Sequence, residues 1–244
     1  MGIEVFKKHL REKRAIKVNA GYNNFNPESI AKICRSAQVA HASAVEIPCD
    51  KTLYEIARKN TRLPIFVSSI HTFDILNAVK WGVDGINIGN FSTLKTHEKK
   101  FNAEEIYDIV LEIMGTINNY DTFICVTIPS NILHKTQVDL VKRLEILGID
   151  MVQVEDLKID NYTGEYELYK TTNLSISQPT GITQQNVVEK FSAGASAIEL
   201  NESIIKIDAE AVLNTAIASI VGAVAYKNSY HREIIRNNRE IFAF

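Results

Sequence analysis

Four ionisable side chains stand inside, or at the end of, short runs that are otherwise rich in β-forming apolar residues: Lys17, Glu46, Glu155 and Glu199. Charged side chains are seldom buried unless they are paired or serve chemistry, because removing them from water is costly. Lys17 allows two readings. It can join a structural ion-pair network with the glutamates, or it can be tuned for Schiff-base formation or proton transfer with a carboxylate as partner. We predict these four side chains as the catalytic set.

An internal repeat places two of these glutamates at equivalent positions. Four segments that lead from a helix-like stretch into a strand align without gaps: residues 41–47, 82–88, 148–154 and 194–200. Their sixth residue is always polar: Glu46, Asn87, Gln153 and Glu199. A barrel interior is filled by layers of four side chains drawn from alternate strands, so these four are expected to share one layer. One such residue could merely hydrogen-bond within the core, but four together predict a site.

A second inward layer is expected two residues further along, nearer the C-terminal mouth where barrel enzymes keep their chemistry. Its members are Pro48, Gly89, Glu155 and Asn201. The polar side chains around the two layers are candidates to bind and orient a polar substrate. These predicted substrate-binding residues are Asn19, Asn87, Gln153, Thr127 and Ser177.

The segment after the seventh strand is the candidate anion site. Barrels that bind phosphorylated ligands commonly use backbone N–H groups from turns after the seventh and eighth strands. We predict Thr180, Gly181 and Thr183 as anion-binding residues, although a simple turn explains them equally well. The turn after the eighth strand, residues 201–203, has no glycine and adds Glu202, so this half of an anion site looks damaged.

No sequence motif indicates a metal or a cofactor. The six histidines are dispersed, and none has the i,i+4 spacing of a zinc pair. P-loop, G-x-G-x-x-G and G-x-S-x-G patterns are missing from the sequence. We therefore predict no metal ligands and leave the cofactor unknown.

Eight β-rich runs alternate with amphipathic segments, a pattern typical of βαβ units around a parallel sheet. The predicted strands are Ala15–Gly21, Ala44–Pro48, Ile65–Ile70, Gly85–Gly89, Thr122–Pro129, Met151–Glu155, Leu174–Gln178 and Ala197–Asn201. Asn26, Asn102 and Thr183 are typical first residues of helices. Gly82, Gly148 and Gly194 are predicted to end helices in the left-handed conformation.

These elements predict a single (β/α)8 TIM-type barrel domain over residues 1–244, with a short N-terminal helix covering its bottom. Residues 156–173 show no convincing amphipathic pattern, and Gly164 between tyrosine-bearing arms suggests a small hairpin or irregular loop. The sixth helix is therefore expected to be missing or degenerate. Another subunit could cover the flank that this would expose, which predicts a homo-oligomer.

Composition excludes several classes of protein. The chain has 244 residues, 45% hydrophobic and 23% charged, with a net charge of −2 and scattered basic residues, so we expect no nucleic-acid partner. Three cysteines without C-x-x-C spacing indicate neither a disulfide framework nor a zinc site. The most apolar stretch, residues 209–225, is interrupted by polar residues, so we expect no membrane span.

Five short motifs carry a family resemblance: residues 17–25 (KVNAGYNNF), 63–69 (LPIFVSS), 87–91 (NIGNF), 126–129 (VTIP) and 194–196 (GAS). In this order they resemble the hypothetical chloroplast reading frame twenty-three family (a ycf family) of algal plastids and cyanobacteria. The resemblance covers most of the chain. It implies a TIM-type barrel of unassigned function and a soluble plastid location without a transit peptide.

Two functions follow from these observations. The first is a small-molecule enzyme or binder whose polar site lies at the C-terminal mouth of the barrel. The second is a non-catalytic barrel that acts as a scaffold or regulatory interaction protein in the plastid, suggested by the degenerate sixth helix and the altered eighth turn. The sequence does not decide whether the chain is an enzyme.

Overall fold

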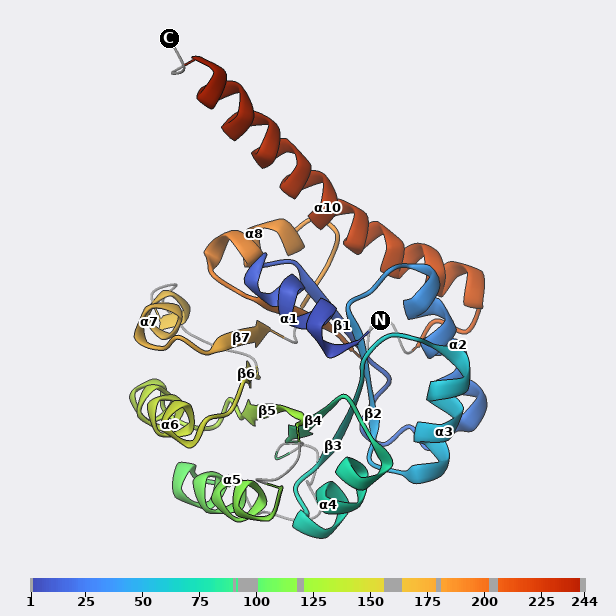
Figure 1. The fold of residues 1–244 in the computed structure, drawn as a ribbon, viewed down its shortest axis with the longest axis vertical. Coiled ribbons are helices and arrows are strands. Elements are labelled where there is room, and N and C mark those ends of the chain that lie inside the picture. Colours follow the sequence, from blue (N-terminus) through green and yellow to red (C-terminus); the bar gives the residue numbers. More distant parts are fainter. Residues whose placement is uncertain are drawn as a thin grey trace.

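The computed structural model describes residues 2–89, 91, 101–117, 121–155, 164–178, 181–201 and 206–241, with side chains omitted for 164–167 and 228–241. Eight parallel strands pair in chain order, and the eighth pairs with the first to close a barrel. Figure 1 shows the helices ranged around the outside of the strands. The predicted (β/α)8 class is confirmed.

Every strand lies within its predicted range. They are β1 (Ala15–Asn19), β2 (Ala44–Pro48), β3 (Ile65–Ser69), β4 (Gly85–Ile88), β5 (Phe123–Ile128), β6 (Met151–Val154), β7 (Ser175–Gln178) and β8 (Ala197–Leu200). All their residues except Ser175 are buried on both faces, since one face lines the barrel interior and the other meets the helices. The outward side chains, such as Val18, Val67 and Ile198, join the large apolar core beneath the helices.

The helices of the shell are α2 (Pro27–Val39), α3 (Lys51–Asn60), α4 (Thr72–Trp81), α5 (Ala103–Ile117), α6 (His134–Leu147), α7 (Gly164–Thr171), α8 (Val187–Ala193) and α10 (Glu210–Ile241). Two predicted starts are confirmed: the Asn26 side chain accepts from the N–H groups of Glu28 and Ser29, and Asn102 accepts from that of Glu105. Each cap satisfies backbone donors that the first helical turn leaves unpaired.

Helices α4, α6 and α8 end at Gly82, Gly148 and Gly194, as predicted, and all three glycines have a positive φ. Gly82 (φ 81°) and Gly148 (φ 84°) adopt the left-handed conformation, whereas Gly194 has a φ of 138° and ψ of −11°. A side chain at Gly194 would lie 2.7 Å from the ring of Tyr169, so close approach of α7 also requires glycine there. The start predicted at Thr183 was wrong, because α8 begins at Val187 after a turn in which Thr183 and Asn186 bond to each other.

The region after β6 differs from the predicted hairpin. Gly164 begins an eight-residue helix, α7, which ends at Thr171 and buries Leu168 against the apolar core. Residues 156–163 lie outside the described part of the chain. The sixth helix of the barrel is therefore present but short. The sequence signal was weak because eight residues span barely two turns, too few for a clear period of 3.6.

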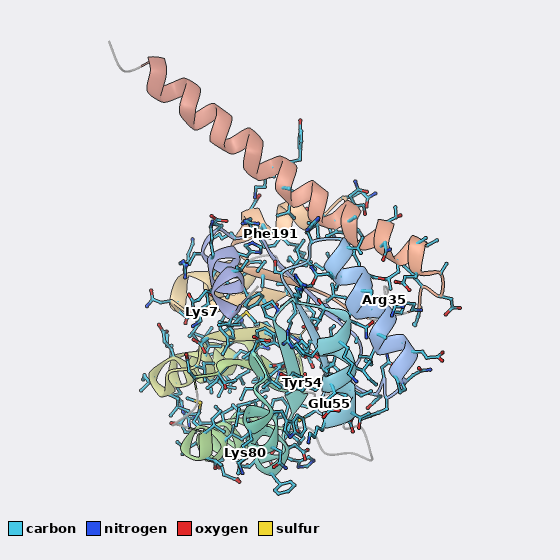
Figure 2. All side chains as sticks on the ribbon, turned by 45° about the vertical axis from the view of Figure 1, so that its right-hand side comes forward. Lys7, Arg35, Tyr54, Glu55, Lys80 and Phe191 are labelled. Atoms are coloured by element: carbon cyan, nitrogen blue, oxygen red, sulfur yellow. The ribbon has the colours of Figure 1, made fainter. Side chains whose placement is uncertain are left out.

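A long C-terminal helix was not anticipated. α10 spans 32 residues, about 48 Å at 1.5 Å per residue. Its first half packs on the barrel through buried side chains at helical spacing: Leu213, Ile217, Ile220 and Val224. Arg35 of α2, labelled in Figure 2, makes two hydrogen bonds with Glu210, of 3.0 and 2.7 Å. Figure 1 shows the rest of the helix extending past the barrel.

The N-terminal helix α1 (Ile3–Arg11) closes the bottom of the barrel, as predicted. Phe6 and Leu10 are buried in a second apolar cluster with inward-facing residues of the strands. The rings of Phe6, Phe66 and Phe123 meet edge to face in a triangle, with centroids 5.1 to 5.5 Å apart. This floor keeps water from the lower barrel. No described helix is both long and apolar enough to cross a membrane.

We expect Phe6→Ala to lower the free energy of unfolding by about 3–5 kcal/mol, because it removes a fully buried ring from this triangle and leaves a cavity. Urea denaturation followed by circular dichroism measures the change. Phe73→Ala is the matched control, since the Phe73 side chain is 74% exposed and should cost no more than about 0.5 kcal/mol. Equal losses in the two variants would contradict the role assigned to the floor.

Candidate functional site

Lys17 is the centre of a buried polar network inside the barrel. It lies on β1 between β2 and β8, pairs in register with Ala44 and Glu199, and is fully buried. Its ammonium forms an ion pair with Glu46, lies 2.8 Å from Glu199 Oε2 and donates to Gln153 Oε1 at 3.1 Å. One cation therefore joins three strands that are distant in the sequence.

Glu46 on β2 is held by neutral donors as well. Its Oε1 accepts hydrogen bonds from Asn87 Nδ2 at 2.9 Å, from Asn19 Nδ2 at 3.3 Å and from the hydroxyl of Ser68. These three side chains point inward from β4, β1 and β3, because residues two apart on a strand share a face. The Glu46 carboxylate thus has partners on both oxygens.

Glu199 on β8 completes the layer. Its Oε1 accepts from Asn19 Nδ2 at 3.0 Å and from Gln153 Nε2 at 3.3 Å. The four repeat residues are therefore connected inside the barrel, as the gap-free alignment predicted, with Lys17 and Asn19 bridging them. We call these six residues the polar network: Lys17, Asn19, Glu46, Asn87, Gln153 and Glu199.

The other predicted side chains surround this network. Thr127 donates to Asn87 Oδ1 at 3.0 Å. A side chain at Gly89 would lie 2.3 Å from the Thr127 hydroxyl, so glycine is needed where the two strands end. Glu155 directly follows β6, and its N–H continues the pairing by donating to Ile128 O at 2.9 Å; its side chain is partly exposed.

Ser177 faces the interior from β7, between Gln153 on β6 and Ala197 on β8. It is fully buried, yet its hydroxyl has no hydrogen-bond partner within the described part of the chain. Buried polar groups without partners are rare, so this hydroxyl in the barrel interior calls for an explanation. The same inward position on β5 is held by Thr127, whose hydroxyl does have a partner.

Two members of the site were not predicted from the sequence. The hydroxyl of Tyr22 accepts from Gln153 Nε2 at 3.2 Å, so this ring lies against the network from the segment after β1. Gly21, with φ 94°, turns the chain there, and its N–H donates to Asn19 Oδ1 at 2.8 Å. Ser68 is the other. The signals that could have found them are the glycine after β1 and the period of two in β3.

Burial and charge set the protonation of the network. Burial alone would lower the pKa of Lys17, but the carboxylates of Glu199 and Glu46 raise it well above its usual range. Burial raises the pKa of Glu199 to about 7, although the ammonium of Lys17 opposes this shift, and the charge of Glu46 adds to it. Burial, followed by the charges of Glu199 and Glu46, also raises the pKa of Tyr22.

The predicted anion site is partly described. Thr180 lies outside the described residues. Gly181 is left-handed with φ 64°, and its carbonyl accepts from Asn186 Nδ2 at 2.6 Å. The N–H of Thr183 donates to Asn186 Oδ1 at 2.9 Å. In the ranges that the structure covers, no cluster of three or more His, Cys, Asp or Glu side chains could hold a metal ion.

Comparison with known proteins agrees with the resemblance seen in the motifs. Residues 3–230 match the family described as "Protein of unknown function (DUF561)". The chain belongs to this family. It is 30% identical over 237 residues to the uncharacterized protein ycf23 of Cyanidium caldarium, covering 91% of this chain and 94% of that one. The ycf23 protein of Pyropia yezoensis is 26% identical and covers 94% and 89%.

Solved structures share the barrel of this DUF561 member. KGPDC from Streptococcus mutans superposes with a TM-score of 0.65, at 10% identity, over 87% of this chain and 97% of that one. Thiamine phosphate pyrophosphorylase from Pyrococcus furiosus gives 0.58, at 15% identity, over 89% and 98%. At such identities the likeness establishes the fold alone, because one barrel fold hosts many unrelated chemistries.

We expect Glu199 to make stability fall as the pH rises. Its pKa is about 4.5 when unfolded and about 7 when folded, so its contribution is complete below pH 4.5 and is lost as the pH rises through 7. The shift corresponds to a loss on the order of 3 kcal/mol across this window. Urea unfolding at pH 5, 6, 7 and 8 measures it, as the difference between the native chain and Glu199→Gln.

The comparison with Glu199→Gln is needed because His9 acts in the opposite direction. Burial lowers the pKa of His9 to about 4, so its contribution is present above pH 6.5 and is lost as the pH falls through 4. Both proteins retain His9, and the difference between them isolates Glu199. A difference that does not change between pH 5 and 8 would show that Glu199 is ionised throughout.

Proposed function

We propose that this protein binds a small polar molecule at the C-terminal mouth of the barrel and exchanges a proton with it. The observation that carries this proposal is the polar network, in which one buried ammonium meets two buried carboxylates beneath the strand ends. Replacing a whole buried ion pair by apolar residues is often neutral or stabilising, so stability alone does not explain why this layer of the barrel is charged. A requirement of function accounts for it better.

Glu199 is proposed as the group that carries the proton. A general acid or base works best when its pKa lies near the working pH, and that of Glu199 is raised to about 7. Asn19 and Gln153 both donate to its Oε1, which fixes the orientation of the carboxyl group. Glu155, at the end of β6, is proposed as the carboxylate that meets the ligand nearest the mouth.

Lys17 and Glu46 are proposed to position the catalytic group. The raised pKa of Lys17 keeps its amine protonated, and a protonated amine is no nucleophile. Of the two readings of Lys17, the contacts with Glu46 and Glu199 support the ion-pair network. Asn87, Thr127 and Ser177 would then orient the ligand, with Tyr22 covering the network from one side.

We propose a plastid location for this function, which the name of the relatives supports. Relatives named ycf23 come from Cyanidium caldarium, Pyropia yezoensis and Cyanophora paradoxa. We propose that the chain works there as one soluble barrel domain, without a nucleic-acid partner. A homo-oligomer is a proposal of the same kind. The predicted anion-binding role of Gly181 and Thr183 is not carried further, because the Thr183 N–H is already bonded to Asn186 Oδ1.

A ligand screen tests the site. Differential scanning fluorimetry of the native chain against a library of neutral, cationic and phosphorylated polar metabolites should find compounds that raise the melting temperature. Glu199→Gln, which keeps the shape of the side chain, should weaken their binding at least about tenfold, as expected when a buried charged hydrogen bond is lost. Isothermal titration calorimetry measures the affinities.

The matched control is Glu55→Gln. Glu55 is exposed on the outer face of α3, where Figure 2 labels it, and this substitution should leave the affinity unchanged. If no compound binds, or if both variants bind as the native chain does, the proposed site fails.

α10 favours a second candidate, an interaction protein. Its C-terminal part extends past the barrel in Figure 1, as a helix does when it reaches toward a partner. Lys227 holds the helix to the barrel by donating to the Ser192 hydroxyl at 2.7 Å. A chain that ends at Lys227 should therefore keep its melting temperature.

We expect a stoichiometric partner that co-purifies with the full chain from its native host to be lost from this shortened chain. Size-exclusion chromatography with light scattering measures the complex. Equal recovery of the partner with both chains would contradict a role for the extended part of α10.

A further inference from the structure

The charges of the polar network do not balance. Glu46 and Glu199 contribute two carboxylates and Lys17 one ammonium, all at most 1% exposed. In the described part of the chain, no basic side chain other than Lys17 is bonded to these carboxylates. An uncompensated buried charge is expensive, so the ionised network calls for one more positive charge.

A hydroxyl without a hydrogen-bond partner indicates where the added positive charge would bind. The Ser177 hydroxyl is fully buried, faces inward and lacks a hydrogen-bond partner among the described residues. It stands between Gln153, which bonds Glu199, and Ala197, which precedes Glu199 by two residues on β8. The Ser177 oxygen faces the same barrel interior as Glu199, and a hydroxyl oxygen can accept a hydrogen bond from a donor group.

The same surroundings do not suit an anion. After burial, the charges of Glu199, Glu46 and Glu155 raise the pKa of Tyr22, so three carboxylates act on this part of the site. In the turn after β7, the Thr183 N–H is already bonded to Asn186. An incoming phosphate would meet like charges and, at Thr183, a donor that is already used.

We infer that the ligand of the proposed site is a cation, an organic amine whose ammonium group donates to Glu199 and to the Ser177 hydroxyl, and that phosphorylated compounds are excluded. This inference rests on the proposed function and adds the chemical class of the ligand. The amine supplies the positive charge that balances the second carboxylate, and the hydroxyl gains the partner that it lacks.

A proton and the amine compete for the carboxylate of Glu199. Glu199 faces Lys17 and Asn19 from β1, Tyr22 from the following segment, Glu46 from β2, Cys125 from β5 and Gln153 from β6. Lys17, Tyr22 and Cys125 have pKa values raised far above neutrality, so they keep their protons between pH 6 and 8. Glu199, with a pKa raised to about 7, must lose its proton for the amine to bind.

The test compares probes that share a skeleton. Butane-1,4-diamine and butan-1-amine, which stay protonated at pH 8, are compared with butane-1,4-diol, and glucose is compared with glucose 6-phosphate, by calorimetry at constant ionic strength. The amines should bind about tenfold more tightly at pH 8 than at pH 6, because the ionised fraction of a group with a pKa of 7 rises about tenfold between them. Calorimetry repeated at pH 6 in buffers of different ionisation enthalpy should show that about one proton is released for each amine bound.

Two variants separate the contributions. Glu199→Gln should lose the pH dependence and the proton release, and its amine affinity should fall at least about tenfold. Ser177→Ala should weaken amine binding about three- to tenfold while keeping the proton release, because it removes one acceptor and leaves Glu199 in place. Ser177→Ala also keeps the test decisive if Glu199→Gln does not fold. Glu55→Gln is the control and should change nothing.

The outcomes distinguish this inference from the function on which it rests. If the library yields ligands and they are neutral or phosphorylated rather than cationic, the inference is overturned while the proposed site stands. Amine binding that does not depend on pH, or that survives both variants, overturns it as well. If the library yields no ligand of any class, the inference and the proposed function fail together.

Discussion

The structure depends on one buried ammonium. Lys17 Nζ is bonded to a carboxylate on each side, from β2 and β8, and to an amide from β6 that is 136 residues away in the chain. In a low-dielectric interior such contacts are strong, and each unmet partner is correspondingly costly. The neighbouring polar residues follow from this constraint, since Asn19, Ser68 and Asn87 donate to carboxylate oxygens that the ammonium leaves available.

The apolar parts of the barrel make this network possible. Below it, the rings of Phe6, Phe66 and Phe123 close the bottom, and the Lys17 ammonium lies 5.4 Å from the centre of the Phe66 ring. Around it, the outward faces of the strands pack against the helical shell. The network is therefore closed from below, and it lies toward the end where barrel enzymes bind their ligands. The polar network can therefore be approached by a ligand only from the C-terminal end of the barrel.

The imbalance of charge within the network connects its structure to its proposed chemistry. Two carboxylates share one ammonium, so one of them must hold a proton or meet an added cation. This gives a DUF561 barrel a chemical character that its likeness to KGPDC and thiamine phosphate pyrophosphorylase does not supply, because fold similarity at 10% and 15% identity carries no information on ligands.

The sequence by itself determined the barrel and its inward polar layer. Side chains alternate between the two faces of a strand, so the position of a residue in its strand sets the face on which it lies. The gap-free repeat then aligned four inward residues, Glu46, Asn87, Gln153 and Glu199, in one layer. It also determined caps such as Asn26, because capping is local chemistry. Only the tertiary structure decided that Lys17 bonds two carboxylates, that Tyr22 and Ser68 join them and that Ser177 is left without a partner. Those contacts depend on the tilt and stagger of the closed barrel, which bring distant strands together and which no short stretch of sequence encodes.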